Sequence, residues 1–220
     1  MPNCVTLNFN DVQIFVSKSS IKFSNGYGIV DAFYYSISDG VIFNIKGIGV
    51  VDKDYNVILD FSPHNYLIKL VVLPHDNFIY LYNSDKDGLM FYDATYVEGG
   101  FRINVKGNAN DFEVLNDNVI KIDISNREVK SYALYNPVSK IFITDIIHYV
   151  GEFKFNSNYG VICGEVCYYV YDNNDNILEI ISYVIDLEGN ILSDFTLINS
   201  NESYTKEVTF EQVVKRILQK

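Results

Sequence analysis

The sequence has no tryptophan, only four prolines and only three histidines among its 220 residues. His64, His75 and His148 form no H-x-H or H-E-x-x-H pattern, so the sequence indicates no zinc site of those classes. It also lacks a G-x-S-x-G elbow, a P-loop and a G-x-G-x-x-G run that opens a helix. These absences argue against the enzyme classes that the motifs identify. We therefore predict no catalytic residue, no metal site and no cofactor.

Cysteines and long apolar runs are equally scarce. The odd, low count of three cysteines, Cys4, Cys163 and Cys167, favours a reducing compartment over a disulfide framework. On one extended strand the Cα atoms of the last two would lie about 13 Å apart, too far for a bridge, so we expect two small buried side chains. No apolar run reaches the length of a membrane span, and the N-terminus has no signal-peptide pattern. We expect a soluble, cytoplasmic protein, in the host cytoplasm if the protein is viral.

Positive charge is in the minority, with 17 basic against 28 acidic residues and a formal net charge of −11. A nucleic-acid binder needs a basic face, so nucleic acid is excluded as the expected partner. Two interpretations of the acidity stay open. It keeps a β-rich surface soluble, or it attracts a basic protein partner. The sequence gives no indication of the oligomeric state.

Apolar residues recur with a period of two rather than 3.6, which is typical of strands. In "AFYYSISDGVIFNI" (32–45) an Asp-Gly pair separates two β-branched and aromatic runs, and Pro74-His75-Asp76 separates two more (66–73 and 77–83). "KIFITDIIHYV" (140–150) continues the pattern. We predict an all-β, antiparallel array of hairpins over residues 1–205, propeller-like or else a β-sandwich. The polar stretch 106–118 is the candidate for a mobile loop or a subdomain seam.

Residues 206–220 change period. Phe210, Val213, Val214, Ile217 and Leu218 fall on one helical face, which predicts one C-terminal α-helix packed on the β domain. The alternative is that this helix docks into the groove of a partner.

One segment recurs along the chain. "VVDKDYNVILDF" (50–61) and "VIDLEGNILSDF" (184–195) align, and "VYDNNDNILEI" (170–180) is a shorter third copy. The pattern predicts a hairpin whose Asp accepts a hydrogen bond from the N–H two residues on. We expect Gly189 to have a positive φ. In the first copy we expect Asn56, rather than Tyr55, to take that conformation, because a bulky residue is strained there.

The acidic residues of these turns, together with those of the turn at 83–88, are the candidate binding residues. They are Asp52, Asp54, Asp85, Asp87, Asp172, Asp186 and Glu188. The N-x-D-x-D-G spacing at 83–88 is similar to the start of a calcium loop, but Ala94 stands where a bidentate carboxylate is needed. Turn chemistry is therefore favoured over calcium.

The first two copies resemble WG-type repeats, which read roughly Trp-Gly, an apolar pair, Asp, two variable residues, Gly and Lys or Asn. "GVVD" (49–52) and "VIDLEGN" (184–190) carry the match, and "YGIVD" (27–31) would place Tyr where the family has Trp. The resemblance implies a β-repeat interaction scaffold and no catalytic residues.

These observations favour a non-catalytic binding protein that recognises another macromolecule through exposed hairpin loops. A specific form is an acidic inhibitor or immunity-type protein acting on a basic partner. The alternatives are a hydrolase with carboxylates in a cleft and a sugar- or small-ligand-binding β-module. The candidate carboxylates are Glu152, Glu165 and Glu179, and the candidate stacking residues are Tyr34, Tyr35, Tyr80, Tyr82, Tyr168, Tyr169 and Tyr171.

Overall fold

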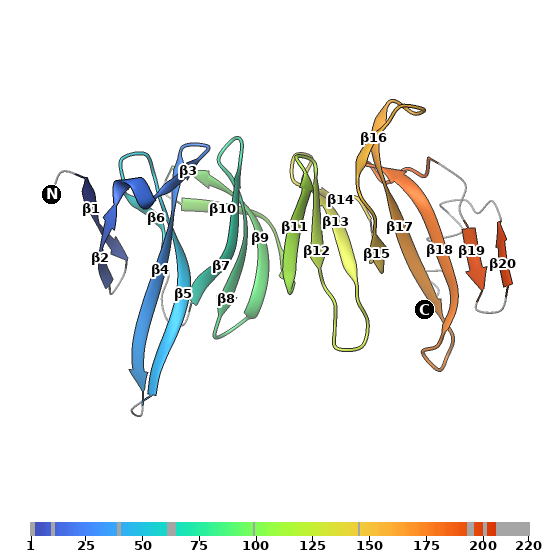
Figure 1. The fold of residues 1–220 in the computed structure, drawn as a ribbon, viewed down its shortest axis with the longest axis horizontal. Helices are drawn as coiled ribbons and strands as arrows, with labels where there is room; N and C mark the ends of the chain where they lie inside the picture. Colours follow the sequence, from blue (N-terminus) through green and yellow to red (C-terminus); the bar gives the residue numbers. More distant parts are fainter. Residues whose placement is uncertain are drawn as a thin grey trace. The chain divides into compact units, whose positions relative to one another are not determined.

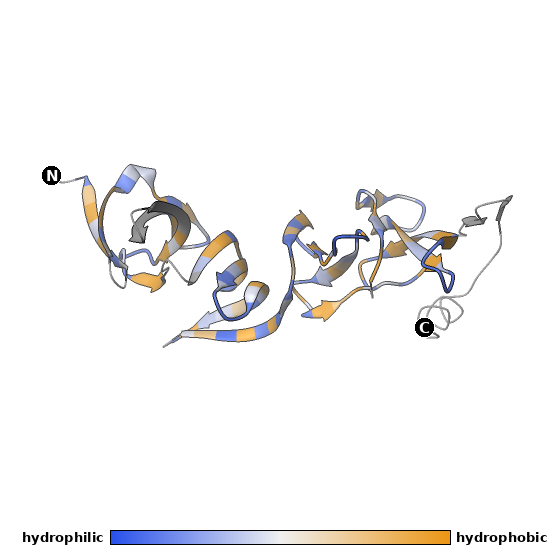
Figure 2. Cartoon of the chain, turned by 90° about the horizontal axis from the view of Figure 1, so that it is seen from below, coloured by the Kyte–Doolittle hydropathy of each residue, from blue (hydrophilic) through white to orange (hydrophobic). Residues whose placement is uncertain are grey.

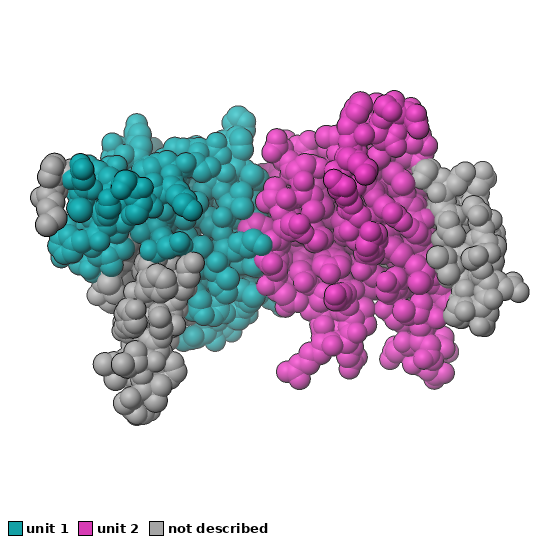
Figure 3. Space-filling model, viewed as in Figure 1, with its two compact units in different colours: residues 1–109 teal, residues 110–220 magenta. Residues whose placement is uncertain are grey.

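The computed structural model describes residues 3–9, 12–38, 41–60, 65–98, 100–144, 146–192, 196–199 and 202–205. The chain divides into two compact units, residues 1–109 and 110–220 (Figure 3). The boundary lies inside the stretch 106–118 that the sequence marked as a possible seam. The predicted C-terminal helix, residues 206–220, lies outside the described residues.

The described residues of unit 1 form ten strands and one short 3-10 turn, labelled in Figure 1. They are β1 (Cys4–Phe9), β2 (Val12–Ser17), η1 (Lys18–Ser20), β3 (Lys22–Ser24), β4 (Tyr27–Ser38), β5 (Val41–Val51), β6 (Val57–Leu59), β7 (Asn65–Leu73), β8 (Asn77–Ser84), β9 (Gly88–Val97) and β10 (Gly100–Asn108). β1 and β2 form a two-stranded sheet, and the others form a sheet in the order β10-β9-β8-β7-β5-β4-β3 with β6 beside β5.

Unit 2 contains two further sheets. The strands are β11 (Asp111–Asn116), β12 (Val119–Asp123), β13 (Tyr132–Asn136), β14 (Ile141–Phe142), β15 (Tyr149–Val150), β16 (Lys154–Asn156), β17 (Val161–Tyr171), β18 (Ile177–Asp186), β19 (Thr196–Asn199) and β20 (Glu202–Thr205). One sheet has the order β11-β12-β13-β14, and the other β15-β17-β18-β19-β20 with β16 beside β17.

The predicted all-β, antiparallel class is confirmed, because every described strand pair is antiparallel and successive strands mostly form hairpins. Period-two patterning is the reason, since it gives each strand one apolar face. Figure 2 shows hydrophobic and hydrophilic residues alternating along strands of both units. Among the described residues η1 is the only helical segment, and none of their helices is long and apolar enough to cross a membrane.

Each unit packs its own core. In unit 1, Val50, Leu67, Phe78 and Ala94 are fully buried and belong to one cluster. In unit 2 a single cluster draws Val119 and Leu134 from one sheet and Val166, Ile181 and Ile185 from the other, so the two sheets share one core.

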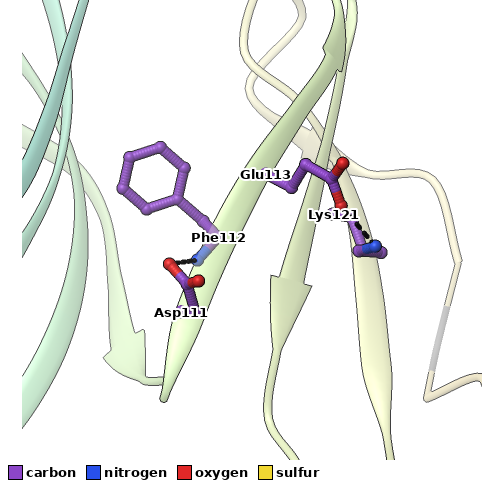
Figure 4. Close-up of polar contacts among 4 residues, drawn as sticks. All are labelled: Asp111, Phe112, Glu113 and Lys121. Atoms are coloured by element: carbon purple, nitrogen blue, oxygen red, sulfur yellow. Dashed lines mark hydrogen bonds and ion pairs between the residues drawn. The ribbon is translucent and has the colours of Figure 1, made fainter.

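Residues 106–118 are not a loop, so the mobile-loop alternative is wrong, whereas the boundary between the two units lies within the stretch. Only Ala109 and Asn110 separate β10 from β11. The stretch is polar because its strands expose one face. In β11, Phe112 is buried whereas Asp111 and Glu113 are exposed. Figure 4 shows how the polar groups are used: the Asp111 carboxylate accepts the Phe112 N–H at 2.7 Å, and Glu113 forms an ion pair with Lys121 of β12.

Residues 140–150 do not form one continuous strand, although their period-two pattern is typical of a strand. β14 and β15 are two-residue strands separated by irregular backbone. The physical reason is that this segment changes sheets. Ile147 pairs with Tyr132 at the end of β13, whereas the next residue, His148, donates its N–H to the Cys167 carbonyl of β17. A straight strand cannot pair with both sheets.

Candidate functional site

Three turns contain the same pattern of hydrogen bonds. In each of them an Asp and the Asn four residues later close the loop. The turns are 52–56, 172–176 and 186–190. In the first, Asp52 Oδ1 accepts the N–H groups of Asp54 and Asn56, each at 2.8 Å, and Oδ2 accepts Asn56 Nδ2 at 2.8 Å. The other two turns repeat every one of these bonds at 2.8–3.2 Å. The predicted role of the Asp carboxylate in the turn is therefore confirmed for all three copies.

The network affects the titration of two of the Asp carboxyls. Burial alone would raise the pKa of Asp52, but hydrogen bonds from the Asn56 side chain and from two backbone N–H groups outweigh it and lower the pKa. In the second turn the N–H groups of Asn176 and Asn174, followed by the Asn176 side chain, lower the pKa of Asp172. Both carboxylates are therefore held in the charged form as structural acceptors.

The fourth residue of each turn has the left-handed conformation. Gly189 has a φ of +87°, as predicted, and Asp175 has +61°. Tyr55 has +66°, so the prediction that Asn56 would replace it there is wrong. The Asp52 network fixes the Asn56 N–H and side chain, which leaves Tyr55 as the residue that must turn. Its ring offsets part of the strain, because it packs edge-on to Phe23 at 5.9 Å and lies 4.9 Å from Lys18 Nζ.

Within unit 2 the candidate acidic residues are not brought together at one site. Four lie in unit 1 and three in unit 2. The turns at 172–176 and 186–190 lie at opposite ends of the ten-residue strand β18, about 30 Å apart. The Asp52, Asp172 and Asp186 carboxylates serve their own turns, whereas the exposed members of the set are Asp54, Asp85, Asp87 and Glu188.

The turn at 83–88 is a plain hairpin connection. Ser84 Oγ accepts the Asp87 N–H at 2.9 Å, and Gly88 has a φ of +71°. Within the described ranges, no group of three or more His, Cys, Asp or Glu side chains is arranged to hold a metal ion.

The cysteines lie where the sequence placed them. Cys163 and Cys167 are both buried in β17, and Cys4 is exposed. Burial raises the pKa of the Cys167 thiol to about 11. Both thiols are therefore buried in the core, as the sequence predicted.

Two of the candidate tyrosines pack against other tyrosines instead of forming a platform, and the side chains of Tyr34 and Tyr35 are not among those that the structure describes. Tyr80 is buried and stacks on Tyr92 with ring centroids 5.0 Å apart, and Tyr168 is buried beside Tyr183 at 5.3 Å. Such pairs stabilise neighbouring strands. Tyr169 and Tyr171 differ, because both line a groove.

The groove is a cavity of about 650 Å³ within unit 2. One wall is the β12–β13 loop, with Asn126, Glu128, Val129 and Lys130, and the other is the β17–β18 hairpin, with Asp175 and Ile177. The lower edge of the magenta unit in Figure 3 shows the notch between two projections, which Figure 1 identifies as these two loops. Its volume is in the usual range of ligand sites.

An aromatic cluster lies between the two loops. His148 and Tyr169 stack with an interplanar angle of 3° and centroids 4.6 Å apart, and His148 Nδ1 accepts the Tyr169 N–H at 2.9 Å. Tyr171 stands edge-on to both rings, at 5.8 Å from His148 and 6.4 Å from Tyr169. The nitrogen that accepts the backbone bond carries no proton, so the neutral ring holds its proton on Nε2. The cluster is therefore a fixed, uncharged aromatic corner.

Sequence reasoning gave His148 no role. Tyr169 and Tyr171 were named, but His148 comes beside them only because β15 pairs with β17 in the register Tyr149↔Cys167. No local pattern signals that register, so the sequence offered no means of finding the groove.

A second cavity of about 520 Å³ lies in unit 2 and contains two of the predicted carboxylates, Glu152 and Glu165. Glu165 accepts the Ser182 hydroxyl at 2.8 Å, and Glu152 pairs with Lys154 at 3.6 Å. Glu179, the third candidate, does not line this cavity.

Comparisons of the chain with protein-family models, with curated proteins and with solved structures find no significant match.

Proposed function

We propose that this is a non-catalytic binding protein that recognises a macromolecule through hairpin loops of unit 2. The observation that supports this most is the groove between the β12–β13 loop and the β17–β18 hairpin, with its aromatic corner. Binding residues are commonly carried on loops that a rigid scaffold positions.

Both loops are held by their own hydrogen bonds. Asn126 Oδ1 accepts the N–H groups of Glu128 and Val129, and Asn126 donates its own N–H to the Val129 carbonyl at 3.1 Å. The Asp172–Asn176 network fixes the opposite hairpin. Loops that are ordered before binding lose less conformational entropy when a partner docks.

Charge favours a basic partner. Unit 2 contains 17 of the acidic residues but only 9 of the basic ones, so it accounts for −8 of the formal net charge of −11. Such a surface attracts a basic protein over distances of about a Debye length. An inhibitor or immunity-type protein acting on a basic target is the specific form we propose. The WG-type resemblance is part of this proposal, because it implies an interaction scaffold.

The proposal is tested by capture on the immobilised full chain at low salt, followed by a dissociation constant for each recovered protein. We expect a basic partner whose affinity falls as salt rises. The matched variants are Asn126→Ala, which releases the groove loop, and Asp87→Asn, an exposed charge in unit 1. Recovery of no partner, an affinity independent of salt, or equal effects of the two variants would contradict the proposal.

A second candidate, a hydrolase, is favoured by one observation, the presence of Glu152 and Glu165 in the same cavity. Two carboxylates that flank a bond are the arrangement used in glycoside hydrolysis. The test is turnover of a panel of aryl glycosides by the full chain. Activity that Glu165→Gln abolishes and Glu179→Gln leaves intact would favour the hydrolase over the binding protein.

A further inference from the structure

The aromatic corner of the groove is suited to a planar cation. Arginine guanidinium groups stack on aromatic faces and are attracted by the negative potential over the ring. Tyr171 stands nearly perpendicular to the His148 and Tyr169 rings, at 70° and 68°, so the corner presents ring faces in two directions. A flat group that lies on one face meets the edge or hydroxyl of the other ring.

Carboxylates stand on both walls of this corner. Glu128 and Asp175 are exposed residues that line the cavity, one on each loop, and Lys130 is the only basic residue among the lining residues. Burial, the neighbouring Tyr169 and the Asp175 charge raise the pKa of the Tyr171 hydroxyl. A cation in the corner would therefore lie between two loops that each carry a carboxylate.

We propose that the groove binds an arginine side chain of the basic partner, with the guanidinium stacked in the His148–Tyr169–Tyr171 corner and paired with Asp175 or Glu128. This inference rests on the proposed function, for which it names the chemistry of recognition. Arginine is favoured over lysine because a planar fork can stack on a ring and reach a carboxylate at the same time, whereas an ammonium is a strongly hydrated point charge. Arginine is also among the residues that most often dominate interface energetics.

The test uses a defined probe, the capped peptide acetyl-Gly-Gly-Arg-Gly-Gly-amide, titrated into the full chain. The readout is the amide chemical shift of Tyr169, whose N–H donates to His148. We expect saturable shifts at the groove, at least about fivefold tighter binding than the lysine peptide, and no binding of the peptide in which neutral citrulline replaces arginine. Equal binding of all three peptides, or binding of a neutral sugar such as N-acetylglucosamine at the same resonances, would overturn the inference.

Variants separate the groove from the rest of unit 2. Tyr171→Leu removes the ring but keeps an apolar side chain, and we expect about three- to thirtyfold weaker binding of the arginine peptide. Asp175→Asn preserves a residue that tolerates the left-handed conformation, so the hairpin should remain folded while the peptide binds at least about twofold more weakly. Tyr159→Leu changes an exposed tyrosine outside the groove and should bind like the wild type.

The same variants distinguish failure of this inference from failure of the proposed function. If the wild type captures a basic partner that Tyr171→Leu and Asp175→Asn bind equally well, the binding protein stands and arginine recognition in the groove is wrong. If the arginine peptide shifts the groove resonances but no macromolecule is captured at any salt concentration, the groove chemistry stands and the proposed macromolecular partner is wrong.

Discussion

Replacement of Gly189 by alanine tests how the third Asp–Asn turn is built into unit 2. Two effects add at this position. The φ of +87° is a conformation that costs an L-residue about 1–2 kcal/mol. In addition, a Cβ at residue 189 would lie 2.4 Å from the Ile143 carbonyl oxygen. Ordinary carbon–oxygen contacts begin near 3.3 Å, so the two segments must separate by roughly 0.9 Å.

That separation has a definite cost. The Ile143 N–H donates to the Leu134 carbonyl at 2.8 Å, and the Gly189 N–H donates to the Asp186 carbonyl at 3.2 Å. A shift that breaks either bond leaves a poorly solvated polar group, which costs about 1–3 kcal/mol. We expect Gly189→Ala to lower the free energy of unfolding of unit 2 by about 2–4 kcal/mol. At a urea dependence of about 1–3 kcal/mol per molar, the midpoint falls by roughly 0.7–4 M.

Gly160 is the matched control. It also belongs to unit 2 and has a φ of +68°, but nothing lies within 4 Å of its Cβ position. Gly160→Ala therefore carries only the backbone strain, about 1–2 kcal/mol. Gly189→Asn separates the two effects, since asparagine tolerates the conformation but still introduces the Cβ.

The assay is urea unfolding of the full chain followed by hydrogen-exchange mass spectrometry, which reports the peptides of each unit separately. Peptides of unit 2 should lose protection at lower urea in Gly189→Ala, and those of unit 1 should be unchanged. If Gly189→Ala and Gly160→Ala have the same midpoint, the contact with Ile143 has no energetic role and the reasoning is refuted.

The remaining predictions concern thiols, buried turns and acid. A thiol reagent at pH 8 should titrate Cys4 rapidly and the two cysteines of β17 only after unfolding, because both are buried and the pKa of Cys167 is about 11; three fast thiols would contradict this. Asp186→Ala should destabilise unit 2 by about 2–3 kcal/mol, more than Asp172→Ala, because the Asp186 side chain is buried whereas Asp172 is half-buried in an exposed turn; equal urea midpoints would count against it. Because the pKa of Asp172 is lowered in the folded state, its stabilisation is complete above the ordinary value of 3.8 and is lost as pH falls through the lower folded-state pKa. Asp172→Asn should therefore weaken the pH dependence of the urea midpoint between pH 4 and pH 2. Between pH 5 and pH 7 it should change that pH dependence little.

The features of the fold that could be predicted from the sequence are those that depend on residues close together in the chain. The Asp–Asn turns follow from side chains at most four residues from their partners, and the hairpin strands follow from period-two patterning. The conformation of Tyr55 was not predictable in this way, because the propensity against positive φ is weaker than three hydrogen bonds to Asp52.

Features that depend on register or on contacts between sheets could not be predicted. The period-two pattern of 140–150 is typical of a strand, and nothing in its own residues marks where the segment leaves β13 and joins β17. The polarity of 106–118 suggested a loop because an exposed strand face and a loop have similar composition. His148 comes beside Tyr169, 21 residues later in the chain, only through that change of sheet.

The acidity of the chain divides into two kinds of carboxylate, and only one kind is available to a partner. Asp52, Asp172 and Asp186 have both oxygens bonded within their own turns, so their charge is partly offset by N–H dipoles. Glu128 and Asp175 instead stand on exposed loops beside the groove. Because recognition depends on local potential rather than on net charge, the salt dependence of partner binding should change with Glu128→Gln and Asp175→Asn, whereas Asp52→Asn should leave it nearly unaltered. A salt dependence that followed net charge alone, with equal changes for all three substitutions, would place recognition outside the groove.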